Sequence, residues 1–482
     1  MNRAATQASS SASGAAASDP FSWRQSLRGF AYNLLLAALF PVVLVYLLWR
    51  LLILGKSRAG FAQRLGFLPK ELRQRLAASG GSSSLAAEEE VVWIHAVSVG
   101  EVTAARPIIR EFRRLEPLAR IVLSTTTPTG RAMAEKAALD VDAFIYFPFD
   151  FPFVVQRVLN ALHPHLLVMV ETELWPNLLW LARRRGVRTA LVNGRISDRS
   201  FDRSRLVRPV YAWALSNLDA ICAQTATDAE RFRALGAAPE AVTVAGNAKF
   251  DEECPEVSPA QAANLRRELG ISEDCSVLVA GSTNPGEEGP ILDAFWRLRV
   301  KHVDARLIIA PRHPERADEI AALIHEHGWS VLRRTDMLQQ AAAPEAPGSS
   351  LPEPHDHPVI ILDTIGELAF VYAVATVVFV GGSLIPKGGH NILQPLALGK
   401  PVLFGPHMHN QKDMASIALR EQVAWQVDNA EQLAETILRL VADLAALARV
   451  AEQGPQVLAN YRGASERAAR RLVALLAHEH AS

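Results

Sequence analysis

The sequence predicts an α/β protein in which two consecutive domains are each built on a parallel β-sheet. From about residue 90 to residue 450, short runs of apolar and β-branched residues alternate with stretches of helical periodicity. The alternation is interrupted at 247–259, where acids and two prolines favour a connection between domains. The runs are apolar throughout, which is typical of strands buried on both faces, so both domains should be Rossmann-like and doubly wound.

Composition agrees with this fold class and excludes others. The chain has 482 residues, of which 49% are hydrophobic and 21% charged, as expected for two or three folded domains. Lys+Arg and Asp+Glu number 50 each, a balance that argues against a nucleic-acid partner. The three cysteines have no paired spacing, so we expect neither a disulfide framework nor a zinc site, and we place the main body in a reducing compartment.

The first element is an apolar segment long enough to cross a bilayer. Residues 1–22, rich in Ser and Ala, predict a disordered tail. Within 23–54, residues 30–49 contain no Asp, Glu, Lys or Arg, and twenty helical residues span about 30 Å. A cleaved signal peptide is the alternative, but no small-x-small cleavage site follows. We therefore expect an uncleaved membrane anchor helix.

The segment 55–86 is expected to be a basic membrane-proximal stretch that ends in a Gly/Ser linker. Residues 50–75 carry seven Lys and Arg side chains and a single acid, Glu71. This bias places the long C-terminal part in the cytoplasm, and the basic cluster could lie on anionic lipid headgroups. A solvated, charged linker is the alternative.

The first domain should cover residues 87–246. Its expected strands are 91–97, 120–125, 144–147, 165–170, 189–192, 219–223 and 242–244, with helices between them. Asp140 and Asp142 match an Asp-x-Asp metal signature, but no further carboxylates surround them, so we interpret them as a turn.

The second domain should cover residues 260–454, after the linker 247–259. Its expected strands are 276–280, 306–310, 330–332, 359–362, 376–380 and 401–404. The Pro-rich tract 339–358 predicts a surface loop. The segment 455–482 predicts a C-terminal helix and is compatible with a return to the first domain. Two doubly wound domains in sequence favour a GT-B-type architecture, with ligands in a cleft at the strand C-termini.

Four strand ends of the second domain carry hydroxyls, charges and turn glycines together. They are 281–288 (GSTNPGEE), 312–316 (RHPER), 363–368 (DTIGEL) and 379–391 (FVGGSLIPKGGHN). Glycines let a backbone approach a ligand, and free N–H groups at a helix start attract phosphate. The last motif alone would suit an ordinary glycine-rich turn, but the four together predict a nucleotide-sugar site.

Acidic and basic side chains follow three strands of the first domain. Glu101 comes after the strand 91–97, in the first turn of a helix, where the dipole should keep it ionised as a general base. A helix-start acid without any chemistry is the alternative. Glu171 and Glu173 follow a second strand and Arg195 a third, which suits an anionic sugar and a hydroxyl that loses its proton.

With these residues assembled, the chain resembles the bacterial 3-deoxy-D-manno-octulosonic acid (Kdo) transferases of lipid A assembly. The resemblance runs over nearly the whole chain after residue 30, including the anchor and the basic stretch 55–69. The motifs that carry it, besides the second-domain motifs above, are 94–101 (IHAVSVGE), 171–177 (ETELWPN), 193–197 (NGRIS), 246–251 (GNAKFD) and 310–316 (APRHPER).

The resemblance implies a glycosyltransferase on the cytoplasmic face of the cell inner membrane. It would transfer Kdo from CMP-Kdo to a lipid A precursor, with inversion and without a metal or other cofactor. Glu101 would be the catalytic base, and Ser98, Gly100, Glu171, Glu173 and Arg195 would bind acceptor or Kdo. The residues expected to bind CMP are Ser282, Thr283, Arg312, His313, Gly366, Ser383, Gly388, Gly389, His390, Asn391 and Gln394.

Two positions depart from the family pattern. Asn284 stands where the family commonly has His, and Gln394 where it commonly has Glu. If that Glu holds a ribose hydroxyl, Gln394 accepts the same hydrogen bond without the strength that a charge adds.

Two other functions remain open at this stage. A sugar-nucleotide epimerase can use the same architecture, although its soluble substrates would not need an anchor. A membrane-tethered binding protein with a decayed site would agree with the two departures.

Overall fold

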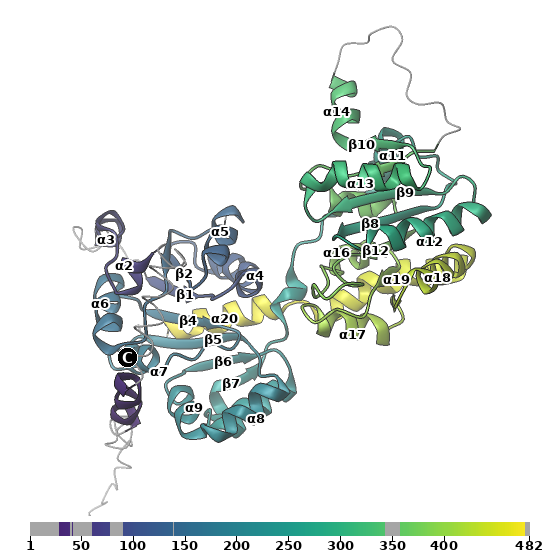
Figure 1. The fold of residues 1–482 in the computed structure, drawn as a ribbon. Coiled ribbons are helices and arrows are strands. Elements are labelled where there is room, and N and C mark those ends of the chain that lie inside the picture. Colours follow the sequence, from purple (N-terminus) through teal and green to yellow (C-terminus); the bar gives the residue numbers. More distant parts are fainter. Residues whose placement is uncertain are drawn as a thin grey trace, which may run out of the picture. The chain divides into compact units, whose positions relative to one another are not determined.

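The computed structural model describes residues 28–38, 41, 60–77, 90–137, 139–342 and 357–477. The chain forms two compact units (Figure 1). Unit 1 contains the chain up to Asp251 together with Gly463 onward, and unit 2 is Glu252–Arg462. The first division falls at the end of a short 3₁₀ helix, Ala248–Asp251, inside the stretch 247–259, and the second falls in the loop at Arg462 and Gly463.

Unit 1 is built on a seven-stranded parallel sheet with the order β3-β2-β1-β4-β5-β6-β7. The strands are β1 (Val91–His95), β2 (Arg120–Thr125), β3 (Ala143–Tyr146), β4 (Leu166–Val170), β5 (Arg188–Gly194), β6 (Ala220–Ala223) and β7 (Val242–Val244). All residues of β1 and β4 are buried, as expected for central strands covered on both faces. The strand order reverses between β1 and β4, and such a switch point is where open α/β sheets bind ligands.

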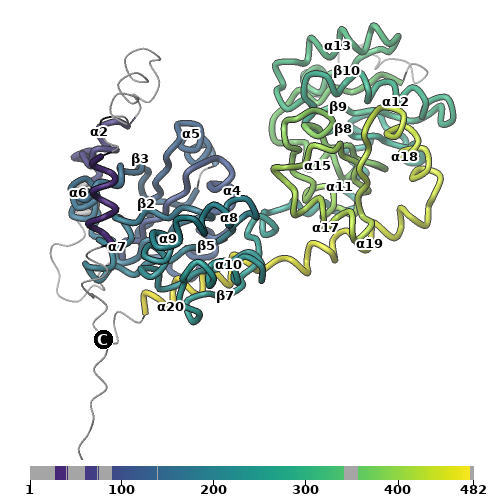
Figure 2. Tube along the Cα trace, turned by 60° about the horizontal axis from the view of Figure 1, so that its bottom comes forward, coloured from purple at the N-terminus to yellow at the C-terminus, as the bar shows by residue number. Residues whose placement is uncertain are grey.

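Helices cover both faces of the unit 1 sheet, and each face has its own apolar core. They are α2 (Phe61–Arg64), α3 (Lys70–Ala77), α4 (Val99–Leu115), α5 (Pro128–Lys136), α6 (Pro152–Leu162), α7 (Pro176–Arg183), α8 (Asp198–Leu206), α9 (Arg208–Leu215), α10 (Ala226–Leu235) and α20 (Ala464–Ala477). The C-terminal helix α20 packs against α4 and adds Leu472 and Leu476 to one core (Figure 2). The last helix of the chain therefore belongs to the same unit as the first strands.

Unit 2 contains a second seven-stranded parallel sheet, with the order β10-β11-β9-β8-β12-β13-β14. The strands are β8 (Val277–Thr283), β9 (Arg306–Pro311), β10 (Val331–Arg333), β11 (Val359–Ile361), β12 (Val377–Val380), β13 (Val402–Phe404) and β14 (Ala424–Gln426). The edge strand β14 was not predicted, because its three residues contain no β-branched run. The switch point of this sheet lies between β8 and β12, the strands that precede the motifs 281–288 and 379–391.

The helices of unit 2 surround its sheet (Figure 1). They are α11 (Pro259–Glu268), α12 (Glu288–Lys301), α13 (Ala317–Glu326), α14 (Arg334–Ala342), α15 (Leu368–Val371), α16 (Leu393–Ala397), α17 (Lys412–Arg420), α18 (Ala430–Ala442) and α19 (Leu444–Tyr461). Helix α14 includes residues 339–342, which we expected to begin a surface loop. Residues 343–356 of that tract lie outside the described residues.

The predicted anchor is described only in part. Residues 28–38 form a helix, whereas most of 39–59 and the whole predicted tail 1–22 lie outside the described residues. Within the described ranges, no helix is both long and apolar enough to cross a membrane. The described part of the basic segment consists of α2 and α3, which pack on unit 1 against β3 and α6.

Candidate functional site

Glu101 lies directly after β1, at the switch point of the unit 1 sheet. As we expected, it occupies the first turn of a helix, α4, which begins at Val99. Its side chain is only 8% exposed and turns back toward the preceding loop. Oε2 accepts a hydrogen bond from the Val97 N–H at 2.7 Å, and Oε1 accepts one from Ser98 Oγ at 3.4 Å. Ser98 therefore contacts the carboxylate itself, and Gly100 is exposed beside it.

The structure corrects the expectation that the helix start keeps Glu101 ionised. Burial raises the pKa of this carboxyl to about 7, even though the bond from the Val97 N–H favours the charged form. The nearby carboxylates of Glu173 and Glu171 raise this pKa further. Desolvation thus outweighs the helix dipole, and the group gains or loses its proton near neutral pH, which suits a general base.

Glu171, Glu173 and Arg195 gather at the same edge of the sheet as Glu101. Glu171 adopts a left-handed backbone conformation with φ of 63°, and its carbonyl accepts a hydrogen bond from the Arg195 N–H at 3.3 Å. Non-glycine residues pay energy to adopt this conformation, and they cluster at functional sites. Burial raises the pKa of Glu173, and the charge of Glu171 acts in the same direction.

Lys249 is a member of this cluster that we did not predict as a site residue. Its Nζ lies 2.8 Å from Glu171 Oε1 in a largely buried ion pair. The loop that carries it is held by the neighbouring strand end, because the Ala248 N–H donates to Asn193 Oδ1 at 2.9 Å. The signal was present in the motif 246–251, but its contact with the motif 171–177 depends on the fold.

In unit 2, the predicted residues of four strand ends occupy separate positions in the loops. Ser282 has a left-handed backbone with φ of 57°, and Thr283 is fully buried. Arg312 and His313 are exposed, and the Arg312 N–H donates to Thr283 O at 2.9 Å. Gly366 is exposed in the turn after β11. The ends of β8 and β9 are therefore joined directly.

The backbone N–H groups of the glycine loop after β12 donate hydrogen bonds to a buried carboxylate. Glu287 is fully buried, and its two oxygens accept hydrogen bonds from four backbone N–H groups at 2.6–3.0 Å. The donors are the N–H groups of Asn284, Gly382, Ser383 and Leu384. The side chain of Ser383 is also fully buried, since its hydroxyl donates to Val380 O and accepts from the Gly405 N–H. This hydroxyl acts within the loop, so a contact with CMP stays a prediction.

The segment 388–391 differs from the phosphate-binding helix start that we expected. The Gly389 N–H donates to Gly382 O at 2.7 Å and the His390 N–H to Gly381 O at 3.2 Å, so both are occupied. Helix α16 begins only at Leu393, whose N–H is capped by Asn391 Oδ1. Gly389 has φ of 74°, and a Cβ there would lie 2.2 Å from Met408 Sδ, so the position requires glycine. Backbone donors at this turn are used to fold it.

Side chains therefore remain as the polar groups that this turn can offer to a ligand. His390 is half-buried, and its Nε2 lies 3.1 Å from Asn284 Nδ2. Asn391 Nδ2 donates to Glu252 Oε2 at 2.8 Å, and Gln394 is partly exposed at the start of α16. Burial lowers the pKa of His390 to about 4, and the charges of Arg312 and His313 act in the same direction.

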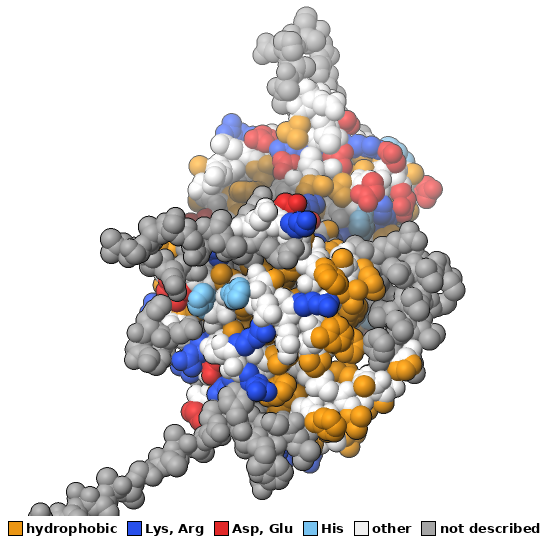
Figure 3. Space-filling view, turned by 90° about the vertical axis from the view of Figure 1, so that its left-hand side faces the viewer, with side chains coloured by type: hydrophobic (Ala, Val, Ile, Leu, Met, Phe, Trp, Pro, Cys, Tyr) orange, Lys and Arg blue, Asp and Glu red, His pale blue; other side chains and the backbone are white. Residues whose placement is uncertain are grey.

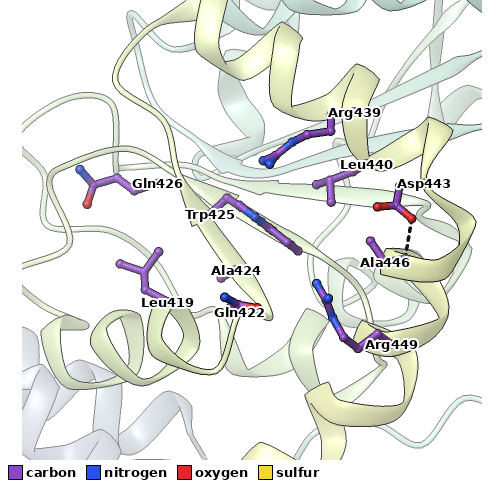
Figure 4. Close-up of a pocket in the computed structure, with 10 residues that line it drawn as sticks. All are labelled: Leu419, Gln422, Ala424, Trp425, Gln426, Arg439, Leu440, Asp443, Ala446 and Arg449. Carbon is purple, nitrogen blue, oxygen red and sulfur yellow. Dashed lines mark hydrogen bonds between the residues drawn. The ribbon is translucent and has the colours of Figure 1, made fainter.

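Other features of the described chain do not belong to this site. Figure 4 shows a pocket of about 500 Å³ beside the edge strand β14, in which Trp425 is flanked by the exposed Arg439 and Arg449. No predicted site residue lines it. The described residues contain no group of three His, Cys, Asp or Glu side chains placed to hold a metal ion. Asp142 instead binds Arg113 at 2.8 Å in the turn before β3.

One face of unit 1 gathers hydrophobic side chains together with several basic ones (Figure 3). The helix 28–38 exposes Phe30, Leu34 and Leu35. Its opposite side is docked by polar contacts. Tyr32 Oη donates to Asp150 Oδ2 at 3.2 Å, and Asn33 exchanges two hydrogen bonds of 2.9 Å with Asn177. The helix is thus attached to the start of α7, directly after the loop that carries Glu171 and Glu173.

Comparisons with known proteins identify the family to which the chain belongs. A family model described as 3-deoxy-D-manno-octulosonic-acid transferase (kdotransferase) matches residues 59–252. The chain is 34% identical to a 3-deoxy-D-manno-octulosonic acid transferase of Bordetella pertussis, over 90% of this chain and 96% of that protein. It is 32% identical to a 3-deoxy-D-manno-octulosonic acid transferase of Haemophilus influenzae, over 82% of this chain and 90% of that protein.

Two further similarities are less complete. A bifunctional glycosyltransferase/methyltransferase of Fusobacterium nucleatum is 36% identical over 73% of this chain, which spans about half (52%) of that longer protein. The crystal structure of a glycosyltransferase from Rickettsia africae has a TM-score of 0.52 at 11% identity, over 81% of this chain and 98% of that one, and supports the fold alone. Because the transferases of Bordetella pertussis and Haemophilus influenzae are both more than 30% identical to this chain and are covered over 96% and 90% of their lengths, the chain belongs to the 3-deoxy-D-manno-octulosonic acid transferase family and is a glycosyltransferase.

Proposed function

We propose that this protein transfers Kdo from CMP-Kdo to a lipid A precursor and releases CMP, with inversion at the anomeric carbon. Kdo transfer in lipopolysaccharide biosynthesis follows from the family. The nucleotide donor, the lipid acceptor, the stereochemistry and the residues that act are our proposal. The observation that carries it is the buried carboxylate of Glu101, which has a pKa near 7 and lies at the switch point of its sheet.

The proposed reaction requires a base next to the acceptor hydroxyl. A sugar hydroxyl keeps its proton at neutral pH, so a base must take it as the oxygen attacks. In the proposed step the acceptor oxygen bonds to the anomeric carbon of Kdo while the bond from that carbon to the phosphate oxygen breaks. The proton passes to Glu101, and the bonding electrons leave with CMP. A single displacement of this kind inverts the configuration.

Charge must also be stabilised on the departing phosphate. The transition state of glycosyl transfer resembles an oxocarbenium ion, so negative charge grows on the leaving group. Arg312 and His390 are the side chains that we assign to it, since the backbone N–H groups of Gly389 and His390 are used within their own loop.

We further propose that the protein is held on the cytoplasmic face of the inner membrane by a single N-terminal anchor. Apolar side chains of the helix 28–38 are exposed on unit 1, together with Phe67 and Phe153. Basic side chains such as Arg157, which lies 4.8 Å from the Phe67 ring, accompany them. Mixed apolar and basic surfaces of this kind bind anionic bilayers, where a lipid acceptor is found.

The test is to incubate the purified full-length protein with CMP-Kdo and a tetraacylated lipid A precursor, and to determine the masses of the products. We expect a glycolipid heavier by whole Kdo residues, with one CMP released for each. The Glu101→Gln variant should bind CMP and lose transfer, whereas Glu230→Gln, an exposed carboxylate on α10, should keep it.

Two other outcomes would contradict the proposal. An isomerised nucleotide sugar without any glycolipid would indicate the epimerase. Binding of CMP without turnover on any lipid acceptor would indicate a membrane-tethered binding protein. Near-normal transfer by Glu101→Gln would leave the activity in place and remove the base that we assign to it.

A further inference from the structure

The side-chain amide of Asn284 contacts both a backbone carbonyl and the His390 ring. Asn284 Nδ2 lies 3.2 Å from Ser282 O and 3.1 Å from His390 Nε2. A carbonyl oxygen accepts hydrogen bonds and cannot donate them, so the amide atom next to Ser282 O has to be the nitrogen. The same nitrogen therefore faces the imidazole.

This contact determines which imidazole nitrogen carries the proton. An amide NH₂ group only donates, so His390 Nε2 must offer its lone pair, and the ring proton must be on Nδ1. An imidazolium ion carries a proton on both nitrogens and would set two donors against each other. Burial and the charges of Arg312 and His313 also disfavour the imidazolium, since together they lower the pKa of His390 to about 4.

The two loops cannot move apart easily, because they are joined at several points. Glu287 accepts hydrogen bonds from the N–H groups of Asn284 and Gly382, at 3.0 and 2.6 Å. Within the loop after β12, the His390 N–H donates to Gly381 O and fixes the backbone of the residue that carries the ring. Gly382 has φ of 70°, and a Cβ there would lie 2.9 Å from His390 Nε2 and Cδ2, so the imidazole fills the space that this glycine leaves. The geometry at Nε2 is thus imposed by the loops.

We propose that Asn284 is a positioning residue that holds His390 as the neutral Nδ1–H tautomer, so that Nδ1 donates a hydrogen bond to the phosphate of the nucleotide donor. The inference deepens the proposed function and depends on it for the identity of the ligand. Within the described chain His390 Nδ1 has no hydrogen-bond partner. The Nδ1–H group can therefore donate to a ligand, whereas the backbone N–H groups of Gly389 and His390 at the same turn already donate to carbonyl oxygens of the protein.

The tautomer can be measured without any turnover. Full-length protein labelled with ¹⁵N-histidine, in detergent micelles, is studied by long-range ¹H–¹⁵N spectra at pH 7.5. The His390 signals are assigned by their loss in His390→Gln. We expect a protonated Nδ1 and an unprotonated Nε2. Asn284→Asp, which turns the donor into an acceptor, should move the proton to Nε2, and Asn284→Leu should give a mixture of tautomers.

Asn284→His serves as the conservative variant, because an imidazole N–H can replace the amide as donor to Nε2. It should preserve the Nδ1–H form of His390. A protonated Nε2 in the unmodified protein, or His390 signals that are identical in Asn284→Asp and Asn284→Leu, would overturn the inference. A structural role alone would change thermal stability without changing the tautomer.

Calorimetric titrations with CMP and with cytidine then test the phosphate contact. Loss of one hydrogen bond to a charged group should weaken CMP binding about tenfold in Asn284→Asp, and less in Asn284→Leu, which keeps part of the Nδ1–H form. Cytidine, which lacks the phosphate, should bind the variants and the unmodified protein alike, and the KM for CMP-Kdo should rise more than kcat falls. Equal losses for both ligands would contradict the contact. A protein that shows this tautomer and this CMP dependence but transfers no Kdo would contradict only the proposed function.

Discussion

Two glutamates follow the switch-point strands of the two units, and they serve opposite purposes. Glu101 comes after β1 and Glu287 after β8, and both side chains are buried. Glu287 accepts four backbone N–H groups, which satisfy its oxygens and join the loops after β8 and β12. Glu101 accepts one hydrogen bond from a backbone N–H and a long one from Ser98 Oγ, and the carboxylates of Glu171 and Glu173 raise its pKa.

The difference shows how burial of the same side chain can give either structure or reactivity. A buried carboxylate that is fully hydrogen-bonded stabilises its surroundings, whereas one that is short of donors is held closer to its neutral form. The second condition produces a base that exchanges protons near pH 7. The number of donors around each carboxylate, and not its place after a strand, therefore decides what the glutamate does.

The largest expected effect is on catalysis by Glu101. We expect kcat for Kdo transfer to fall by about 10²–10⁴-fold in Glu101→Gln, because general-base catalysis contributes in that range. In the unmodified protein log(kcat/KM) should rise with a slope near one below pH 7 and level off above it, since the base must lose its proton. The rate is measured from CMP release between pH 5 and 9. If the variant retains the same rising limb, another group is responsible for it.

The next effect is on the free energy of unfolding and concerns Glu287, the glutamate to which we assign a structural role. Glu287→Ala leaves four buried N–H groups without an acceptor, and we expect it to lower the free energy of unfolding by about 3–5 kcal/mol. Urea titrations followed by tryptophan fluorescence give this value, with the exposed Glu435→Ala as the matched control. A loss below 1 kcal/mol would show that solvent reaches these donors and that the carboxylate does not stabilise the contact between the two loops.

A third effect is a gain in the free energy of unfolding, opposite to the loss expected for Glu287→Ala, and it concerns Glu101 alone. Its folded pKa of about 7 lies above the ordinary value of 4.5, so the unfolded chain releases this proton first and stability falls as pH rises between those values. Glu101→Gln removes this dependence. We therefore expect the variant to gain about 1–3 kcal/mol relative to the unmodified protein between pH 5 and pH 8. Urea titrations at both pH values measure it, and a relative loss at pH 8 would mean that the ionised form is stabilised by folding.

Much of this arrangement could be predicted from the sequence, for identifiable reasons. Buried strands such as β4 are continuous apolar runs, so their position was evident, and the polar residues after β1 and β8 marked the strand ends. The edge strand β14 has no such run. The pKa of Glu101 and the contact of Asn284 with His390, 106 positions apart, depend on packing between distant segments. For the same reason the N–H groups at Gly389 and His390 looked free and are occupied.

The smallest effect concerns Asp150, a buried carboxylate that accepts more hydrogen bonds than Glu101 and fewer than Glu287. It accepts hydrogen bonds from the N–H groups of Asn177 and Leu178 and from Tyr32 Oη, yet its complete burial raises its pKa to about 7. Tyr32→Phe removes one donor, which we expect to cost about 0.5–1.5 kcal/mol of unfolding free energy. The cost should be larger at pH 8 than at pH 5, because the lost donor stabilises the charged form more, and the pKa of Asp150 should rise further. Tyr211→Phe, also in unit 1, is the control. Equal costs at both pH values would show that the tyrosine attaches the helix 28–38 without influencing the carboxylate, and that donor number does not govern this third case.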